Sequence, residues 1–173
     1  WQDNTLNAYV TQIGSDNTAS VDQIGKSNTS TIEQIGGAAF NMASINQGGF
    51  ANNSLITQSG DYNDATLTQS AGRDDATITQ GGDSNTASLS QSGSNGRDRD
   101  SSITQNGDDN SATITQSGGE FSTASITQLT DGNLATVFQS GDNNQATVMQ
   151  TVATGNIANV SQTGTGNITN IIQ

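Results

Sequence analysis

Carboxylates, hydroxyls and carboxamides are the groups in this 173-residue sequence whose spacing could produce a binding site, since it contains no Cys and no His. Without these two residues there is no thiolate nucleophile, no Ser-His-Asp triad and no imidazole or thiolate metal ligand. Acidic pairs at Asp74–Asp75 and Asp108–Asp109 suggest calcium binding. Calcium-binding β-rolls, however, repeat about every nine residues, and these carboxylates keep no such period. We therefore expect solvated acidic turns, no cofactor or metal, and no enzymatic activity.

Threonines two residues apart suggest a second kind of site, the flat hydroxyl face of an ice-binding solenoid. They occur at Thr66/Thr68, Thr77/Thr79 and Thr113/Thr115. If successive strands alternate between two sheets, the second pair faces away from the other two and the array is broken. A monomeric solenoid that acts as an adhesin or binds ice is therefore an alternative that the pattern does not favour.

Composition excludes two further classes of function. Sixteen acidic residues against four basic residues give a formal charge of -12, and four cations cannot neutralise a phosphate backbone, so we expect no nucleic-acid binding. No apolar run approaches the ~20 residues of a membrane-spanning helix, so we expect no membrane insertion. Only 12% of the residues are charged, about half the usual ~25%, which also argues against a highly charged disordered linker.

A repeat of about eleven residues runs through the sequence and orders its polar groups. Ten of its fourteen intervals are eleven residues long, and the repeat is marked by Gln12, Gln23, Gln34, Gln47, Gln58, Gln69, Gln80, Gln91, Gln105, Gln116, Gln128, Gln139, Gln150, Gln162 and Gln173. Two residues before each Gln lies an aliphatic residue, namely Val10, Val21, Ile32, Ile45, Ile56, Leu67, Ile78, Leu89, Ile103, Ile114, Ile126, Val137, Val148, Val160 and Ile171.

Three other positions are fixed in the same frame. Ala lies four residues before Gln in eleven of the fifteen units. Asn lies six residues before it in eleven units, as Asn17, Asn28, Asn41, Asn52, Asn63, Asn85, Asn110, Asn133, Asn144, Asn156 and Asn167. Gly lies two residues after it in eleven units, as Gly14, Gly25, Gly36, Gly49, Gly60, Gly82, Gly93, Gly107, Gly118, Gly141 and Gly164.

The period inside each unit is two, because Asn, Ala, the aliphatic residue and Gln alternate with polar residues. This predicts a strand of about six residues with one inward face, followed by a turn in which Gly, Asp, Ser or Asn adopts positive φ. The sequence therefore predicts an all-β, flattened parallel β-solenoid with two strands per coil of about 22 residues. Residues 1–173 would form a single array of fifteen strand–turn units.

The longer units place their extra residues between Gln and the next strand, near 37–40, 94–99, 119–121 and 152–154. A solenoid tolerates insertions in turns, whereas one extra residue inside a strand would reverse the facing of every later side chain. The longest insertion, 94–100, carries two of the four basic residues. We interpret it as a solvated loop with balanced charges, with a binding loop as the alternative.

The Asn and Gln positions predict structural amide ladders. Each amide needs only a copy of itself one coil above and below, and such stacking satisfies a group that would cost about 1–3 kcal/mol if it were buried and unpaired. In a two-strand coil, Gln80 should stack between Gln58 and Gln105. The aliphatic and Ala side chains should fill the narrow space between the sheets.

The motif Gln-x-Gly-x-x-Asn-x-Ala-x-x-x-Gln resembles the curlin repeat of curli subunits. It is complete in Gln12-Gly14-Asn17-Ala19-Gln23, Gln58-Gly60-Asn63-Ala65-Gln69, Gln80-Gly82-Asn85-Ala87-Gln91, Gln105-Gly107-Asn110-Ala112-Gln116 and Gln139-Gly141-Asn144-Ala146-Gln150. The resemblance covers nearly the whole sequence. It implies a secreted bacterial amyloid subunit that polymerises at the cell surface as biofilm matrix. The implied partners are other copies of the chain, a nucleator subunit, an outer-membrane secretion pore and accessory chaperones.

Some features depart from that family pattern. The array holds about seven and a half two-strand repeats instead of the usual five, and we expect no export segment before the repeats. Asp74, Arg99 and Ser122 replace Asn, and Thr130 and Val152 replace Gly. The major fibre subunit and the minor nucleator therefore both fit the resemblance.

The two ends of the array bear on assembly. The pattern begins by Leu6 and finishes at Gln173, with no proline or charge cluster over either end. Solenoids that stay monomeric need capped ends, and an unpaired strand edge is a template for another chain. The sequence therefore predicts head-to-tail stacking of copies into a cross-β fibre.

Overall fold

The computed structural model describes residues 5–37, 39–93 and 98–173, which form fifteen strands and no helix. None of these residues lies in a helix long and apolar enough to cross a membrane. The strands are β1 (Asn7–Gln12), β2 (Thr18–Gln23), β3 (Thr29–Gln34), β4 (Met42–Gln47), β5 (Asn53–Gln58), β6 (Asp64–Gln69), β7 (Asp74–Gln80), β8 (Thr86–Ser92), β9 (Arg99–Gln105), β10 (Ser111–Ser117), β11 (Thr123–Gln128), β12 (Leu134–Ser140), β13 (Gln145–Gln150), β14 (Ile157–Thr163) and β15 (Ile168–Ile172).

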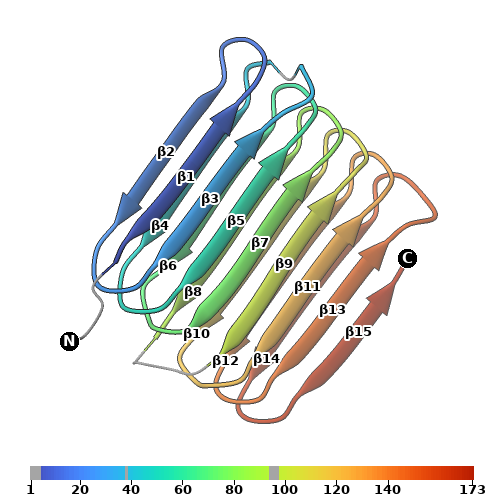
Figure 1. Ribbon diagram of the computed structural model, residues 1–173. Helices are drawn as coiled ribbons and strands as arrows, with labels where there is room; N and C mark the ends of the chain where they lie inside the picture. The colour runs from blue at the N-terminus through green and yellow to red at the C-terminus, as the bar shows by residue number, and fades with distance from the viewer. Residues whose placement is uncertain (1–4, 38, 94–97) are drawn as a thin grey trace.

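The strands form two parallel sheets that lie face to face (Figure 1). The odd sheet has the order β1-β3-β5-β7-β9-β11-β13-β15, and the even sheet has the order β2-β4-β6-β8-β10-β12-β14. Each strand therefore pairs with the strand two units away, and the chain winds through about seven turns of about 23 residues. The predicted all-β, two-strand parallel solenoid is confirmed. The first and last strands lie at opposite ends of the stack.

The register places equivalent residues of neighbouring units side by side. In the pairing of β5 with β7, for example, Ile56 lies beside Ile78 and Gln58 beside Gln80. The alternating sequence then turns one side of every strand toward the opposite sheet, so that like residues form continuous columns. A shift of one residue would carry a whole set of inward side chains to the solvent, and this fixes the register.

The core between the sheets consists of the aliphatic and Ala columns. The twelve predicted aliphatic residues from Ile32 to Val160 are all buried, and each contributes roughly 1.5–3 kcal/mol relative to an exposed position. Val21 and Ile171, one coil nearer the ends, are partly buried. The prediction that Val10 is buried is wrong: it is 49% exposed, because the odd sheet ends at β1 and no coil covers it.

The turns share one conformation that the sequence pattern assigned to other residues. In all fourteen turns the residue just before the Asn position has positive φ, between 50° and 73°: Asp16, Ser27, Phe40, Ala51, Tyr62, Arg73, Ser84, Asp98, Asp109, Phe121, Gly132, Asn143, Gly155 and Gly166. Most of these are not Gly, so the coil-to-coil hydrogen bonds must hold side-chain-bearing residues in a left-handed conformation that ordinarily costs about 1–2 kcal/mol.

Three of the predicted turn glycines do not adopt positive φ. Gly60, Gly82 and Gly107 are absent from the positive-φ residues of the described chain, so the backbone explanation given for them is wrong. These positions require Gly because the turns pack closely. A Cβ on Gly60 would lie 2.1 Å from the Gly82 carbonyl oxygen, and a Cβ on Gly82 would lie 2.4 Å from the Gly107 carbonyl oxygen. At these levels successive turns stack backbone on backbone.

Candidate functional site

The Gln side chains form two continuous hydrogen-bonded columns, one at the end of each sheet's strands. In the odd sheet each Nε2 donates to Oε1 of the Gln one coil later, at 2.8–3.0 Å, through Gln12, Gln34, Gln58, Gln80, Gln105, Gln128, Gln150 and Gln173. In the even sheet the same bonds, at 2.8–3.1 Å, join Gln23, Gln47, Gln69, Gln91, Gln116, Gln139 and Gln162. Every bond therefore runs from the N-terminal toward the C-terminal end of the stack.

Each Gln also ties its coil together. The Nε2 of Gln80 lies 3.1 Å from the Asp64 carbonyl oxygen and 3.0 Å from that of Asn85, in addition to Gln105 Oε1. Asp64 begins a strand of the opposite sheet, so one amide connects both sheets and two levels. Gln80 is fully buried, as are the other Gln residues of the middle coils, whereas Gln12 and Gln173 at the ends are exposed.

Hydroxyl residues in the Ala column add to these bonds. The four units with Ser or Thr in that column, at Ser30, Ser54, Ser101 and Thr169, all lie on odd-sheet strands. Each hydroxyl accepts a hydrogen bond from the Nε2 of a Gln on the even sheet, as Ser101 does from Gln91 at 3.2 Å. The replacement of Ala by Ser or Thr therefore supplies a polar partner inside the core.

The Asn column differs from the predicted amide ladder. The Oδ1 of each Asn accepts the backbone N–H at the same position one coil later, as Asn63 does from Asn85 at 2.9 Å, and the same bond recurs along both columns. At several levels Nδ2 donates to a turn carbonyl, as Asn63 does to Gly82 at 2.8 Å, whereas the Nδ2 atoms of Asn85 and Asn110 are buried without a hydrogen-bond partner. The prediction that Asn amides stack on one another is wrong for all but the Asn144–Asn167 pair, because the short side chain reaches the neighbouring backbone first.

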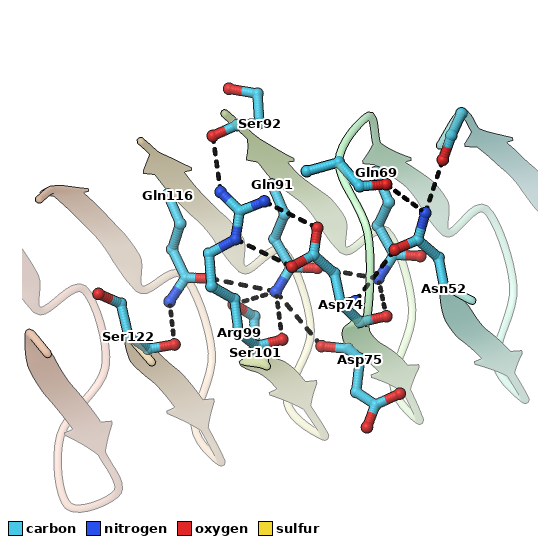
Figure 2. A network of polar contacts seen from close by, with 12 residues as sticks. Asn52, Gln69, Asp74, Asp75, Gln91, Ser92, Arg99, Ser101, Gln116 and Ser122 are labelled. Atoms are coloured by element: carbon cyan, nitrogen blue, oxygen red, sulfur yellow. Dashed lines mark hydrogen bonds and ion pairs between the residues drawn. The ribbon is translucent and has the colours of Figure 1, made fainter. Parts of the chain in front are cut away.

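One Asn column contains a buried ion pair in place of two amides (Figure 2). This column runs through Asn28, Asn52, Asp74, Arg99, Ser122, Asn144 and Asn167. Arg99 Nε donates to Asp74 Oδ1 at 2.9 Å and Arg99 Nη2 donates to Asp74 Oδ2 at 2.8 Å. Arg99 Nη1 donates to the Ser92 carbonyl oxygen at 2.6 Å. Both side chains have 0% exposure.

The prediction of a solvated charged loop is therefore wrong for Arg99, while residues 94–97 of that loop lie outside the described residues. Arg99 belongs to β9 and points inward, because it occupies the Asn position six residues before Gln105. Burial raises the pKa of Asp74, and the bonds and charge of Arg99 act to lower it; burial is the larger effect. Sequence reasoning noted both substitutions but missed the pair. The signal was present: opposite charges occupy the same inward position in units that stack one coil apart.

A column of carboxylates lines the turns that follow the odd-sheet strands. The Oδ1 atoms of Asp61, Asp83, Asp108 and Asp131 each accept a backbone N–H from the turn one coil earlier, at 2.8–2.9 Å. These carboxylates are thus part of the stacking geometry, and they bring like charges to successive levels. In the described ranges, no three acidic residues are close enough together to hold a metal ion.

The outer edge of the last strand has an assignable hydrogen-bonding pattern. Gln173 donates its backbone N–H to the Met149 carbonyl oxygen, and the Asn167 carbonyl oxygen accepts from Gln145. In a parallel strand the N–H and C=O of one residue point to the same neighbour, and successive residues alternate. Asn167, Thr169, Ile171 and Gln173 therefore face β13, and Ile168, Asn170 and Ile172 direct their backbone groups to the open edge.

These features describe a surface suited to stacking. The inward Gln residues donate to their equivalents one coil later, and the open edges of β1 and β15 present the same kinds of group as the buried levels.

Comparison with known proteins agrees with this architecture. The family model of the curlin associated repeat matches six segments of the chain, residues 3–36, 41–70, 73–105, 96–129, 119–151 and 130–164. Together they extend over most of the sequence. None of the curated proteins matches the chain.

Proposed function

The chain belongs to the curlin-repeat family, and we propose that it is the structural subunit of an extracellular, curli-like amyloid fibre that grows by head-to-tail stacking of copies. The family is one of structural repeat proteins. The observation that carries the proposal is the direction of the Gln columns, in which every Nε2 donates toward the C-terminal end.

This direction makes the two ends of the stack complementary. The last coil offers the Nε2 donors of Gln162 and Gln173, and the first coil offers the Oε1 acceptors of Gln12 and Gln23. Head-to-tail docking continues the column, whereas docking of two like ends would bring acceptor to acceptor or donor to donor. Because unpaired buried amides are costly, this chemistry favours a single polarity of growth.

The cellular setting follows from family membership and is likewise proposed. A curli-like subunit is secreted through an outer-membrane pore, with accessory chaperones, and polymerises on a nucleator subunit at the cell surface. The fibre then serves as biofilm matrix and in surface adhesion. A chain of this kind works through its copies and needs no cofactor, nucleic acid or membrane insertion.

A pair of proline variants at the open edge tests the docking. Asn170 directs its backbone N–H outward, so Asn170→Pro should leave the solenoid folded and block the addition of the next copy. Ile171 directs its N–H to β13, so Ile171→Pro should loosen the subunit's own last coil. Growth from preformed seeds, followed by electron microscopy, should stop with Asn170→Pro. This variant should also cap growing wild-type fibres when it is added at a low molar ratio.

The matched control changes only the outward side chain. Asn170→Ala keeps the N–H and should elongate like the parent chain. Elongation of Asn170→Pro at the parent rate would show that copies do not dock through this strand. A soluble particle whose size does not depend on concentration would instead identify a monomeric binding module.

A further inference from the structure

Most coil-to-coil interfaces in this solenoid are chemically interchangeable. The Gln column presents the same residue at every level, the aliphatic column presents Ile, Leu or Val, and the Asn column of the even sheet presents Asn at all seven levels from Asn17 to Asn156. A coil that skipped its proper neighbour and stacked on the next one would recover nearly all of these contacts. Repetition alone therefore specifies the columns well and the order of the coils poorly.

The interface between β7 and β9 is different. Asp74 and Arg99 lie at the same inward position of the two strands, in register, and form two parallel hydrogen bonds with both side chains fully buried. The guanidinium is also held by the Ser92 carbonyl oxygen. Below the pair the column continues with Asn52, which accepts the Asp74 backbone N–H at 3.0 Å. Above it the column continues with Ser122 (Figure 2).

A skipped coil at this interface would separate the two charges. If β9 stacked on β5, Arg99 would face Asn52, and no carboxylate of the column would be within reach. If β11 stacked on β7, Asp74 would face the single hydroxyl of Ser122. Separating a buried pair is strongly unfavourable because each charge loses its partner without regaining water, whereas uncharged Asn or Ser would tolerate either arrangement.

We infer that the Asp74–Arg99 pair is a register determinant, which fixes β9 onto β7 and thereby sets the order of coils in the middle of a self-similar array. Buried polar groups that select one register among near-equal alternatives are known in coiled coils. The pair contributes specificity more than stability, because well-packed uncharged residues often match the stability of a buried ion pair. The inference concerns a single chain and does not rest on fibre growth.

Cysteine reporters can measure coil order, since the chain contains no Cys. Thr79 and Thr104 face outward as register partners on β7 and β9, about 4.8 Å apart, within the Cα separation that a disulfide allows. Thr79→Cys with Thr104→Cys therefore reports the native order. Thr57 lies one strand further away, on β5, so Thr57→Cys with Thr104→Cys can oxidise only when the coil containing β7 is skipped.

The reporters are placed in the parent chain and in Asp74→Asn with Arg99→Asn, then refolded from denaturant at high dilution and oxidised. The uncharged variant should fold, because Asn is the residue of most other levels. Its skipped-coil disulfide should rise at least tenfold over the parent, relative to the native reporter. The matched control is Asn63→Ser with Asn85→Ser, two adjacent levels of the uncharged column, which should stay at the parent value.

Two results would overturn the inference. One is a skipped-coil yield in the uncharged variant within twofold of the parent, and the other is an equal rise in the Asn63→Ser, Asn85→Ser control. Should the Asn variant fail to fold, the reporters go into Asp74→Ser with Arg99→Ser, which copies the residue present at Ser122. Failure of that chain to fold as well would make the pair a requirement for folding and would also overturn its role in register.

Discussion

At the scale of single residues, the Gln side chains are the most heavily connected groups of the molecule. The buried Gln residues of the middle coils accept from the coil below, donate to the coil above and contact carbonyl oxygens within their own coil. A truncated Gln therefore leaves several buried partners unsatisfied at once.

Gln80→Ala tests this role. We expect it to lower the free energy of unfolding by about 1–3 kcal/mol, since Gln58, Gln105 and two carbonyl groups lose a partner in a dry environment. Gln80→Asn should recover part of the loss, because it keeps the amide on a shorter side chain. Chemical denaturation of the monomer is the measurement, and Gln12→Ala, at the exposed end of the same column, is the control. Equal losses at Gln12 and Gln80 would contradict the burial argument.

Removal of Arg99 should make stability depend more strongly on pH. In Arg99→Asn the guanidinium, whose hydrogen bonds and charge lower the Asp74 pKa, is gone, while burial and the neighbouring Asp75 still raise it. A carboxyl whose pKa is raised in the folded state contributes stability below its ordinary pKa of 3.8, and that contribution is lost as the pH rises through the folded-state pKa. We therefore expect this variant to unfold more easily at pH 7 than near pH 4.

The reciprocal variant provides the contrast. Asp74→Asn leaves a buried guanidinium that cannot lose its proton, so acid should not rescue it. The two unfolding curves should diverge as the pH falls. Parallel curves would mean that Asp74 stays ionised without Arg99.

These residues also show how far the sequence alone could be taken. The Gln and aliphatic positions follow from strict periodicity, so the pattern assigns the same neighbours as the structure, including Gln58 and Gln105 on either side of Gln80. The bonding of Asn depends on the reach of a short side chain at a turn, which periodicity does not encode. The Asp74–Arg99 pair depends on which two units stack, and only the two-strand coil brings those units together.

At the scale of strands and turns, the distance between successive coils is controlled by glycines that do not have positive φ. A side chain on Gly82 would meet the carbonyl of the next turn, so the distance between coils would have to open locally. Gly155 is the opposite case: it has φ 72° and nothing within 4 Å of an added Cβ. Gly is therefore required for close packing of the turns at one level and for a left-handed backbone conformation at another.

Gly82→Ala should therefore be more harmful than Gly155→Ala. At Gly155 we expect a loss of about 1 kcal/mol, from the left-handed conformation alone. At Gly82 the added methyl strains the hydrogen bonds of two adjacent coils, and the loss should be clearly larger. Thermal unfolding of both monomers gives the comparison, and a greater loss at Gly155 would show that turns do not set the coil spacing.

At the scale of the whole molecule, net charge should oppose the proposed stacking of copies. The chain carries a formal charge of -12, and its carboxylates recur at successive levels of one edge, as at Asp83 and Asp108. In the proposed fibre, docking another copy would extend that column. Repulsion between approaching copies acts at long range and is weakened by ions in solution.

Fibre growth should accordingly be faster in salt. Raising sodium chloride from about 10 mM to about 500 mM shortens the screening length from ~30 Å to a few ångströms, and we expect the seeded elongation rate to rise. Partial protonation near pH 4 should act in the same direction. Thioflavin fluorescence during seeded growth is a suitable readout, and a rate that is flat across the salt series would show that charge does not limit docking.

The one-way bonds of the Gln columns also give the stack a permanent electric moment. Backbone dipoles of a parallel sheet point alternately up and down the stack and largely cancel, whereas the thirteen side-chain amide bonds all point the same way. Their moments add as peptide dipoles do along an α-helix, with the positive pole at the β14–β15 end. A fibre of head-to-tail copies would then carry a permanent dipole along its whole length. Neighbouring fibres would have the lowest electrostatic energy when they lie antiparallel.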